Sequence, residues 1–278
     1  MPTITIATIT SRVPASHKPT SFPRRREPTT PGGDPSDGCV DPRLRGDDEA
    51  LEDVSATALS RLMTWLSPAF PVGGFSYSHG LEWVVEQGSL RDAGALGNWI
   101  EDVLVHGAGR TDIILLAGAW RAVSAGDAKL LADTAELAAA FTPTSERRLE
   151  TLAQGTAFLK ATQAVWPHPA LEALAGSDAE VAYPVAVGAA AATHGLALAL
   201  TAQAFCQAFA ANLVSAGVRL IPLGQTDGLR VISRLEPLIP LLVAEALAAG
   251  LDDIGGAAIA ADIASMRHKT QYTRLFRS

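Results

Sequence analysis

The stretch VAYPVAVGAAAATHGLALALTAQAFCQAFAANLVSAGV, residues 181–218, contains 38 residues and not one Asp, Glu, Lys or Arg. Most of it is Ala and Gly, with His194, Gln203 and Asn212 set among them. A helix that is apolar on every side lies in the centre of a core or in a subunit interface, and small side chains let neighbouring backbones approach closely. The stretch therefore predicts central, closely packed helices, and it makes a helical oligomer plausible.

A membrane location is the alternative interpretation of the same stretch, because a membrane-spanning helix needs only about 20 residues. The stretch lacks the dense Leu, Ile, Val and Phe content that favours insertion, and its polar side chains are costly in lipid. A membrane-associated helical protein is therefore the less favoured hypothesis.

Helical periodicity continues on both sides of this stretch, from residue 56 onward. Asp92 is a predicted N-cap, and the apolar residues of 96–103 follow it as one buried stripe. Ile259, Ile263 and Met266 have the same spacing and predict a second inner face. No alternating β-branched run is long enough to require a sheet. We expect an all-α fold, a single compact bundle of about eight to ten helices of roughly 11–12 residues each.

Charge and cysteine content exclude several classes of protein. The formal net charge is −7, so the chain lacks the basic surface that nucleic-acid binding requires. Its two cysteines, Cys39 and Cys206, lie far apart and have no metal-ligand spacing. The sequence therefore predicts neither a disulfide framework nor a structural zinc site, and it fits the reducing cytoplasm.

The first 55 residues differ from the rest in composition. They hold 8 of the 17 prolines and the basic run at 24–26, and they show no helical repeat. Such a segment cannot bury enough apolar surface to offset its ordering entropy. We expect residues 1–55 to be a disordered extension, or an over-extended start, and residues 56–278 to form the helical domain.

Catalytic motifs are absent from the sequence. It contains no GxxxxGK[ST] phosphate loop, no HExxH and no GxSxG. His79 and Glu82 lie three residues apart and would meet on one helix face as an acid/base or metal pair. A small all-α enzyme that uses this pair is one alternative function. The other interpretation gives both residues structural roles.

Three segments combine aromatic, basic and helix-breaking residues in an unusual way. They are LSPAFPVGGFSYSHGLEW at 66–83, which predicts a helix that opens near Ser76, SAGVRLIPLGQTDG at 215–228, and ASMRHKTQYTRLFRS at 264–278. The second segment places one charge, Arg219, at the end of the uncharged stretch, where it needs a carboxylate or carbonyl partner. The third reaches the C-terminus, and chain ends fray unless they are docked.

In this order and spacing, the three segments resemble the signatures of the urease accessory protein F family, which assembles the urease nickel centre. The resemblance covers residues from about 56 to 278. It implies an all-helical, dimeric, cytoplasmic protein without catalytic activity and with no directly bound cofactor. It also implies a scaffold that joins urease accessory proteins D(H) and G on the urease apoprotein for GTP-dependent nickel insertion.

The resemblance also implies roles for single residues. The partner-binding residues are Glu82, Arg219, Gln225, Tyr272, Arg274 and Arg277. Phe75 and Tyr77 fall on positions of the dimer interface, and no position is implied to be catalytic or to bind metal. Because terminal segments are usually the least packed part of a domain, we expect removal of residues 272–278 to cost the helical core little.

Overall fold

The computed structural model describes residues 56–176 and 180–278. Within these ranges the protein is entirely helical, which confirms the predicted all-α fold class. The expected disorder of residues 1–55 lies outside the described residues. The described elements in chain order are α1 (Ala56–Trp65), η3 (Gly74–Ser76), α2 (Leu81–Glu86), α3 (Ala93–His106), α4 (Ala108–Ser124), α5 (Ala128–Ala140), α6 (Ser145–Val165), α7 (Pro169–Ala175), α8 (Tyr183–Thr193), α9 (Leu198–Leu220), α10 (Gln225–Leu235), α11 (Leu238–Ala248), η4 (Leu251–Asp253) and α12 (Ile259–His268).

The described ranges hold twelve α-helices, where the sequence predicted eight to ten. Two of them, α2 and α7, have only six and seven residues, and a count based on average helix length does not register such short elements. The N-cap at Asp92 is confirmed, because its carboxylate accepts a hydrogen bond from the backbone N–H of Ala95 at 2.9 Å. The helix expected near Ser76 begins only at Leu81, after a 3₁₀ turn.

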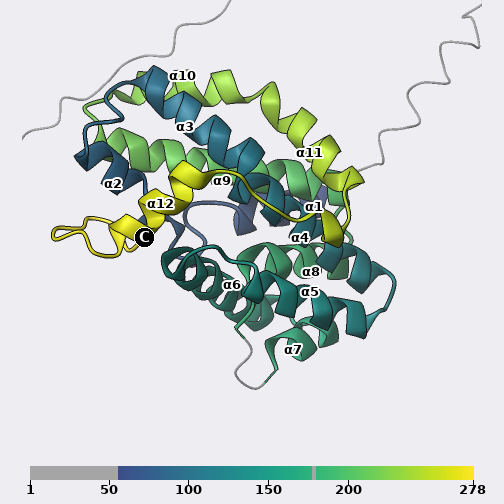
Figure 1. The fold of residues 1–278 in the computed structure, drawn as a ribbon. Coiled ribbons are helices and arrows are strands. Elements are labelled where there is room, and N and C mark those ends of the chain that lie inside the picture. Colours follow the sequence, from purple (N-terminus) through teal and green to yellow (C-terminus); the bar gives the residue numbers. More distant parts are fainter. Residues whose placement is uncertain (1–55, 177–179) are drawn as a thin grey trace, which may run out of the picture. The chain divides into compact units, whose positions relative to one another are not determined.

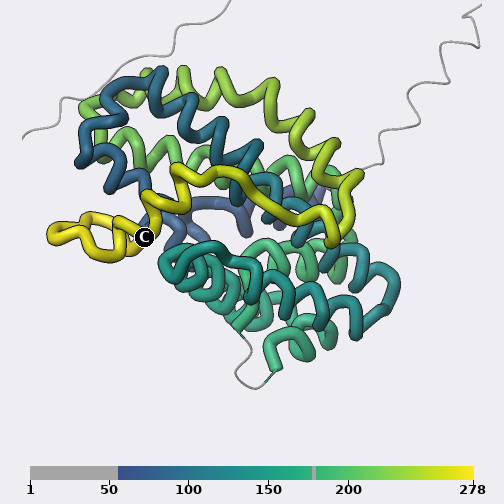
Figure 2. The backbone as a smooth tube through the Cα atoms, in the orientation of Figure 1, coloured from purple at the N-terminus to yellow at the C-terminus, as the bar shows by residue number. Residues whose placement is uncertain are grey.

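Helix α4 connects two groups of helices (Figure 1). On one side it packs against α3, α9 and α11, and on the other against α5 and α8. Helix α8 lies beneath α4 and α6, and eight of its eleven residues are buried. The backbone tube in Figure 2 follows the same close arrangement of α4, α6 and α8. The prediction of a central small-residue helix is confirmed for α8.

Glycines set the distance between these central helices. A Cβ on Gly188 in α8 would lie 2.2 Å from the carbonyl oxygen of Leu116 in α4. A Cβ on Gly155 in α6 would lie 1.9 Å from the carbonyl oxygen of Val181. No side chain fits at either distance, so the close packing of α8 depends on these two glycines.

Helix α9 contains the second half of the uncharged stretch, residues 198–218. It packs against α10, α11, α4 and α3, and nine of its residues are buried. By length and composition α9 could cross a membrane, and it is the one helix in the described residues that could. A core helix of a soluble protein passes the same test, so this is weak support for a membrane location.

The predicted inner face of α12 is wrong. Ile259, Ile263 and Met266 are 66%, 45% and 53% exposed, whereas the buried residues of α12 are Ala264, Ser265 and His268. The reason is steric, because a Cβ at Gly80 would lie 2.5 Å from the backbone nitrogen of Ser265. Small residues therefore face the domain, and the apolar stripe of α12 is exposed.

Candidate functional site

Glu82 holds the C-terminal segment of the chain. It lies in the first turn of α2, which begins after Gly80 in the left-handed conformation at φ 76°. The buried Glu82 carboxylate accepts hydrogen bonds from the backbone N–H groups of Leu275 at 2.6 Å and Phe276 at 3.0 Å. A residue of the second helix therefore fixes the backbone of a segment almost 200 positions away.

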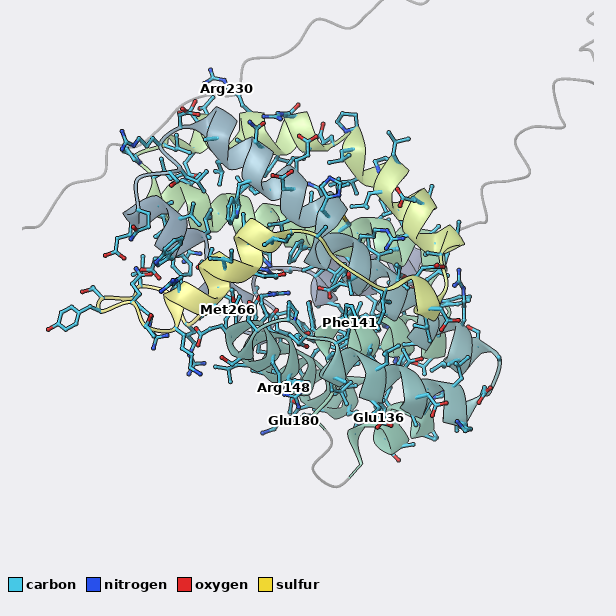
Figure 3. All side chains as sticks on the ribbon, in the orientation of Figure 1. Glu136, Phe141, Arg148, Glu180, Arg230 and Met266 are labelled. Carbon is cyan, nitrogen blue, oxygen red and sulfur yellow. The ribbon has the colours of Figure 1, made fainter. Side chains whose placement is uncertain are left out.

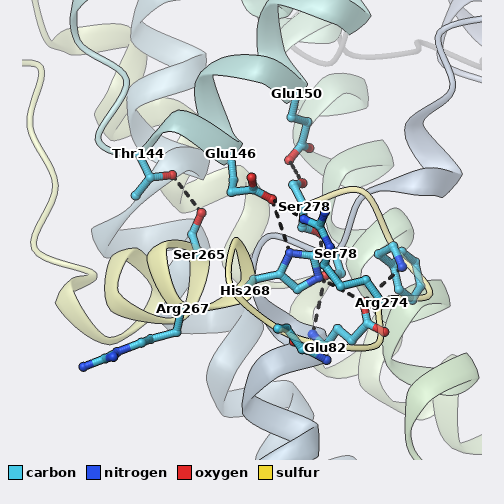
Figure 4. Close-up of polar contacts among 12 residues, drawn as sticks. Ser78, Glu82, Thr144, Glu146, Glu150, Ser265, Arg267, His268, Arg274 and Ser278 are labelled. Atoms are coloured by element: carbon cyan, nitrogen blue, oxygen red, sulfur yellow. Dashed lines mark hydrogen bonds and ion pairs between the residues drawn. The ribbon is translucent and has the colours of Figure 1, made fainter.

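His268 connects this carboxylate to a second one. Its ring is fully buried, with Nε2 at 2.9 Å from Glu82 and Nδ1 at 3.3 Å from Glu146 (Figure 4). Both ring nitrogens face carboxylate oxygens, so His268 bridges the two carboxylates. The guanidinium of Arg274 lies 3.4 Å from Glu146 and supplies a positive charge. We call Glu82, Glu146, His268 and Arg274 the carboxylate–histidine cluster.

The last residue of the chain, Ser278, binds to Ser78 and to Glu150 of α6. The backbone oxygen of Ser278 accepts hydrogen bonds from the N–H of Ser78 at 2.6 Å and from its hydroxyl at 2.7 Å. The Ser278 hydroxyl donates to Glu150 at 2.8 Å, and the N–H of Arg277 donates to the carbonyl of Ser76 at 2.7 Å. The C-terminus is therefore part of the folded domain.

Glu150 also pairs with Arg147 and with His79. Burial alone raises the pKa of Glu150, but Arg147 at 2.8 Å, His79 and the Ser278 hydroxyl together lower this pKa to about 2. The pKa of His79 is lowered, first by burial and then by the charge of Arg147. Its Nε2 lies 2.6 Å from Glu150 and 2.7 Å from Arg147. His79 thus lies inside the buried Arg147–Glu150 ion pair.

The predicted meeting of His79 and Glu82 on one helix face does not occur. His79 precedes α2 at a φ of 55°, and it contacts the Arg147–Glu150 pair of α6. Glu82 contacts His268 and the C-terminal backbone instead. The two side chains lie in separate clusters, so the structure does not bring them together as an acid/base pair.

Arg219 connects the end of α9 to the loop before α2 and to the C-terminal segment. Its guanidinium donates to the carbonyl of Phe75 at 3.0 Å and to that of Ser215 at 3.2 Å. It also lies 4.5 Å from the ring centroid of Phe276, a cation–π contact. The prediction that Arg219 finds carbonyl partners is confirmed, and its partners include a residue of the C-terminal segment.

The expectation of a loosely packed C-terminus is wrong. Phe276 and Ser278 are buried, and Glu82, Arg219 and Glu150 each contact residues 275–278. Loss of residues 272–278 would remove a hydrogen-bond or cation–π partner from each of these charged groups, and a buried charge that loses partners is destabilising.

The structure also places the other predicted site residues. Gln225 is exposed at the first position of α10, and Tyr272 and Arg277 are exposed in the C-terminal segment. Phe75 is 64% exposed, whereas Tyr77 is only 4% exposed and packs inside its own domain. Their predicted roles in partner binding and dimer formation stay predictions.

Exposed apolar and basic side chains gather on α12 and the C-terminal segment. We call this group the C-terminal surface, and it consists of Ile259, Ile263, Met266, Arg267, Lys269, Tyr272, Arg274, Leu275 and Arg277. Met266, which Figure 3 labels on α12, is one of these exposed side chains. Exposed apolar groups with a charged rim are typical of a protein–protein contact.

Sequence reasoning missed Glu146, Arg147, Glu150, His268 and Ser278. The signal was present but ambiguous, because charged residues at 146, 147 and 150 on a helix look like a solvated face. In residues 56–176 and 180–278, no group of three or more His, Cys, Asp or Glu residues could hold a metal ion. The clusters thus consist of buried ion pairs and hydrogen bonds.

Comparison with known proteins identifies relatives over most of the chain. A family model described as UreF matches residues 90–236. The urease accessory protein UreF of Rhodopseudomonas palustris strain HaA2 is 55% identical over 229 residues, which cover 82% of this chain and 97% of that protein. The protein of the same name from Bradyrhizobium sp. strain BTAi1 is 50% identical over 229 residues, covering 82% of this chain and 95% of that protein.

The buried Glu82 carboxylate predicts a large effect for Glu82→Gln. The amide cannot satisfy His268 and two backbone N–H groups, so we expect a loss of about 3 kcal/mol of unfolding free energy. For a domain of this size this lowers Tm by roughly 6–12 °C. Trypsin should also cut the variant after Arg274, which mass spectrometry detects.

The matched control is Glu86→Gln, a change at an exposed position of the same helix, and it should behave as the parent chain does. A Glu82→Gln chain with the parent's Tm and trypsin resistance would contradict the docking role.

Asp112 in α4 predicts a pH-dependent effect. Burial raises the pKa of Asp112 to about 7, with a smaller raising contribution from Glu150 and a lowering one from Arg147. The folded chain thus favours the protonated form, and the carboxyl destabilises the fold increasingly as pH rises from about 4 to 7. Asp112→Asn should therefore raise the unfolding free energy by about 2 kcal/mol more at pH 8 than at pH 5.

Thermal unfolding at both pH values measures this difference, with the exposed change Asp252→Asn as the control. An equal effect at the two pH values would show that Asp112 does not titrate in this range.

Proposed function

The chain belongs to the UreF family of urease accessory proteins, and we propose that it acts in urease maturation as a non-catalytic scaffold that bridges accessory proteins D(H) and G. In this role it supports GTP-dependent nickel insertion into apo-urease. The family assignment rests on identities of 50–55% to curated relatives that the chain matches over at least 95% of their length. The bridging role is our inference from the C-terminal surface and the family resemblance.

The C-terminal surface is the observation that carries the proposal. It combines exposed Ile263 and Met266 with Arg267 and Arg274. A complementary partner would present apolar side chains and carboxylates. Exposed large apolar groups, together with Arg and Tyr, are the residue types that most often dominate interface energy.

The buried clusters explain how this surface keeps its shape. Glu82 and His268 fix the backbone of the C-terminal segment and the inner side of α12, while the side chains of Ile263 and Met266 stay exposed. A preformed surface loses less conformational entropy on binding than a frayed tail would. Glu82 therefore supports partner binding indirectly, by holding the segment that the partner contacts.

We infer the homodimer from the family resemblance, and exposed Phe75 supports it. Phe75 lies next to the Arg219 contact, so a second copy of the chain would bind close to the C-terminal segment. Tyr77 is buried in its own domain and would act by supporting the 73–77 loop rather than by touching the partner.

Two alternative functions have less support. An enzyme that uses His79 and Glu82 would need the two side chains together, and they lie in separate clusters. A membrane-associated protein has α9 in its favour, but α9 packs against other helices of the domain. We therefore place the protein in the cytoplasm, with nickel and GTP bound by its partners.

Single substitutions on exposed apolar residues test the scaffold role. Ile263→Glu places a charge in the C-terminal surface. Leu241→Glu makes the same kind of change at an exposed position of α11. Both variants should keep the parent's circular dichroism and Tm. Ile263→Glu should weaken co-purification with accessory proteins D(H) and G at least tenfold, a loss of about 1.4 kcal/mol or more.

The control Leu241→Glu should assemble the complex normally. An Ile263→Glu chain that binds both partners as the parent does and activates urease would show that the C-terminal surface is not the bridge. Turnover of any substrate by the isolated chain would contradict the non-catalytic role.

A further inference from the structure

A cavity of about 300 Å³ lies beside the buried clusters. Helices α3, α4, α5, α6, α8 and α12 contribute to its walls, together with the loop before α6. The walls are mainly apolar, with side chains such as Val103, Leu115, Phe141 and Pro143. The volume is at the lower end of the range for small-molecule pockets, about 300–1,000 Å³.

Most polar side chains that line the cavity already have a partner. The hydroxyl of Thr111 donates to the carbonyl of Gly255 at 3.3 Å, that of Thr142 donates to the Ala138 carbonyl, and that of Thr151 accepts from the N–H of Tyr183. Arg147 and His79 are engaged with Glu150.

Two lining carboxyl groups are different. The carboxyl groups of Asp112 in α4 and Asp262 in α12 make no hydrogen bond or ion pair with any residue that the structure describes. Burial raises the pKa of both groups, to about 7 for Asp112. Because the one guanidinium in the wall is neutralised by Glu150, the unpaired charge that the cavity can develop is negative. Both residues are half-buried, and a carboxylate that is partly removed from water without a partner is costly, so a cation is the complementary ligand.

We propose that this cavity binds a primary alkylammonium group, with the ammonium at Asp112 and Asp262 and the alkyl chain against the apolar wall. A compact ammonium has three N–H donors, which two carboxylates can accept. A neutral ligand of the same shape would leave both carboxylates without a counter-charge. A divalent metal ion fits less well, because no group of three or more ligating side chains occurs in the described residues.

The alkylammonium has two chemical sources, a free amine or the lysyl side chain of a bound protein. Ala258 lines the cavity and directly precedes exposed Ile259 of the C-terminal surface, and Ala261, which also lines the cavity, lies two positions from Ile259 and from Ile263. A protein bound to that surface could therefore insert a Lys side chain. The amine site itself does not depend on the proposed function, because the isolated chain should bind a free amine.

Isothermal titration calorimetry with n-pentylamine, on the isolated full-length chain, tests the proposal. We expect saturable binding of one amine per chain, and at least tenfold weaker binding of 1-pentanol, which has the same shape without the charge. Asp112→Asn and Asp262→Asn should each weaken amine binding about tenfold or more, while exposed Asp252→Asn should not change it. Circular dichroism confirms that the variants are folded.

Absence of amine binding, equal binding of 1-pentanol, or undiminished binding by both cavity variants would each overturn the proposal. A second titration uses the chain in its complex with the accessory proteins. Loss of amine binding there identifies a lysyl side chain as the natural occupant, and retained binding identifies a free amine. Failure of the complex to form would instead count against the proposed function and leave the amine result intact.

Discussion

The carboxylate of Glu82 is the interaction on which the candidate site depends. It is buried, it binds His268, and it accepts two backbone N–H groups from the C-terminal segment. A buried carboxylate is stable only when it is fully partnered, and here the partners come from α12 and from the C-terminal segment. One charge therefore joins α2, α12 and the C-terminus into a single unit.

This unit needs close backbone packing as well as charge. Gly80 begins α2 in the left-handed conformation, and its missing side chain lets the backbone of Ser265 approach. Close approach brings His268 between Glu82 and Glu146, and it turns Ile263 of α12 outward. The exposed apolar stripe is thus a consequence of the buried cluster.

The sequence predicted the parts of the fold that follow from local patterns. The helical period, the Asp92 cap and the small-residue core helix α8 are confirmed because each depends on neighbouring residues in the chain. The outward face of α12 was not predictable, because apolar spacing shows which residues share a face but not which way it points. The partners of Glu82 were missed for a related reason, since ion pairs between residues 186 or more positions apart leave no local pattern.

Native-state hydrogen exchange at the amides of Leu275 and Phe276 tests the central claim most directly, because these two N–H groups donate to Glu82. The account predicts that both amides exchange as slowly as those of the buried face of α12, and far more slowly than the amide of exposed Tyr272. Exchange of Leu275 and Phe276 at the rate of an unstructured peptide would contradict it.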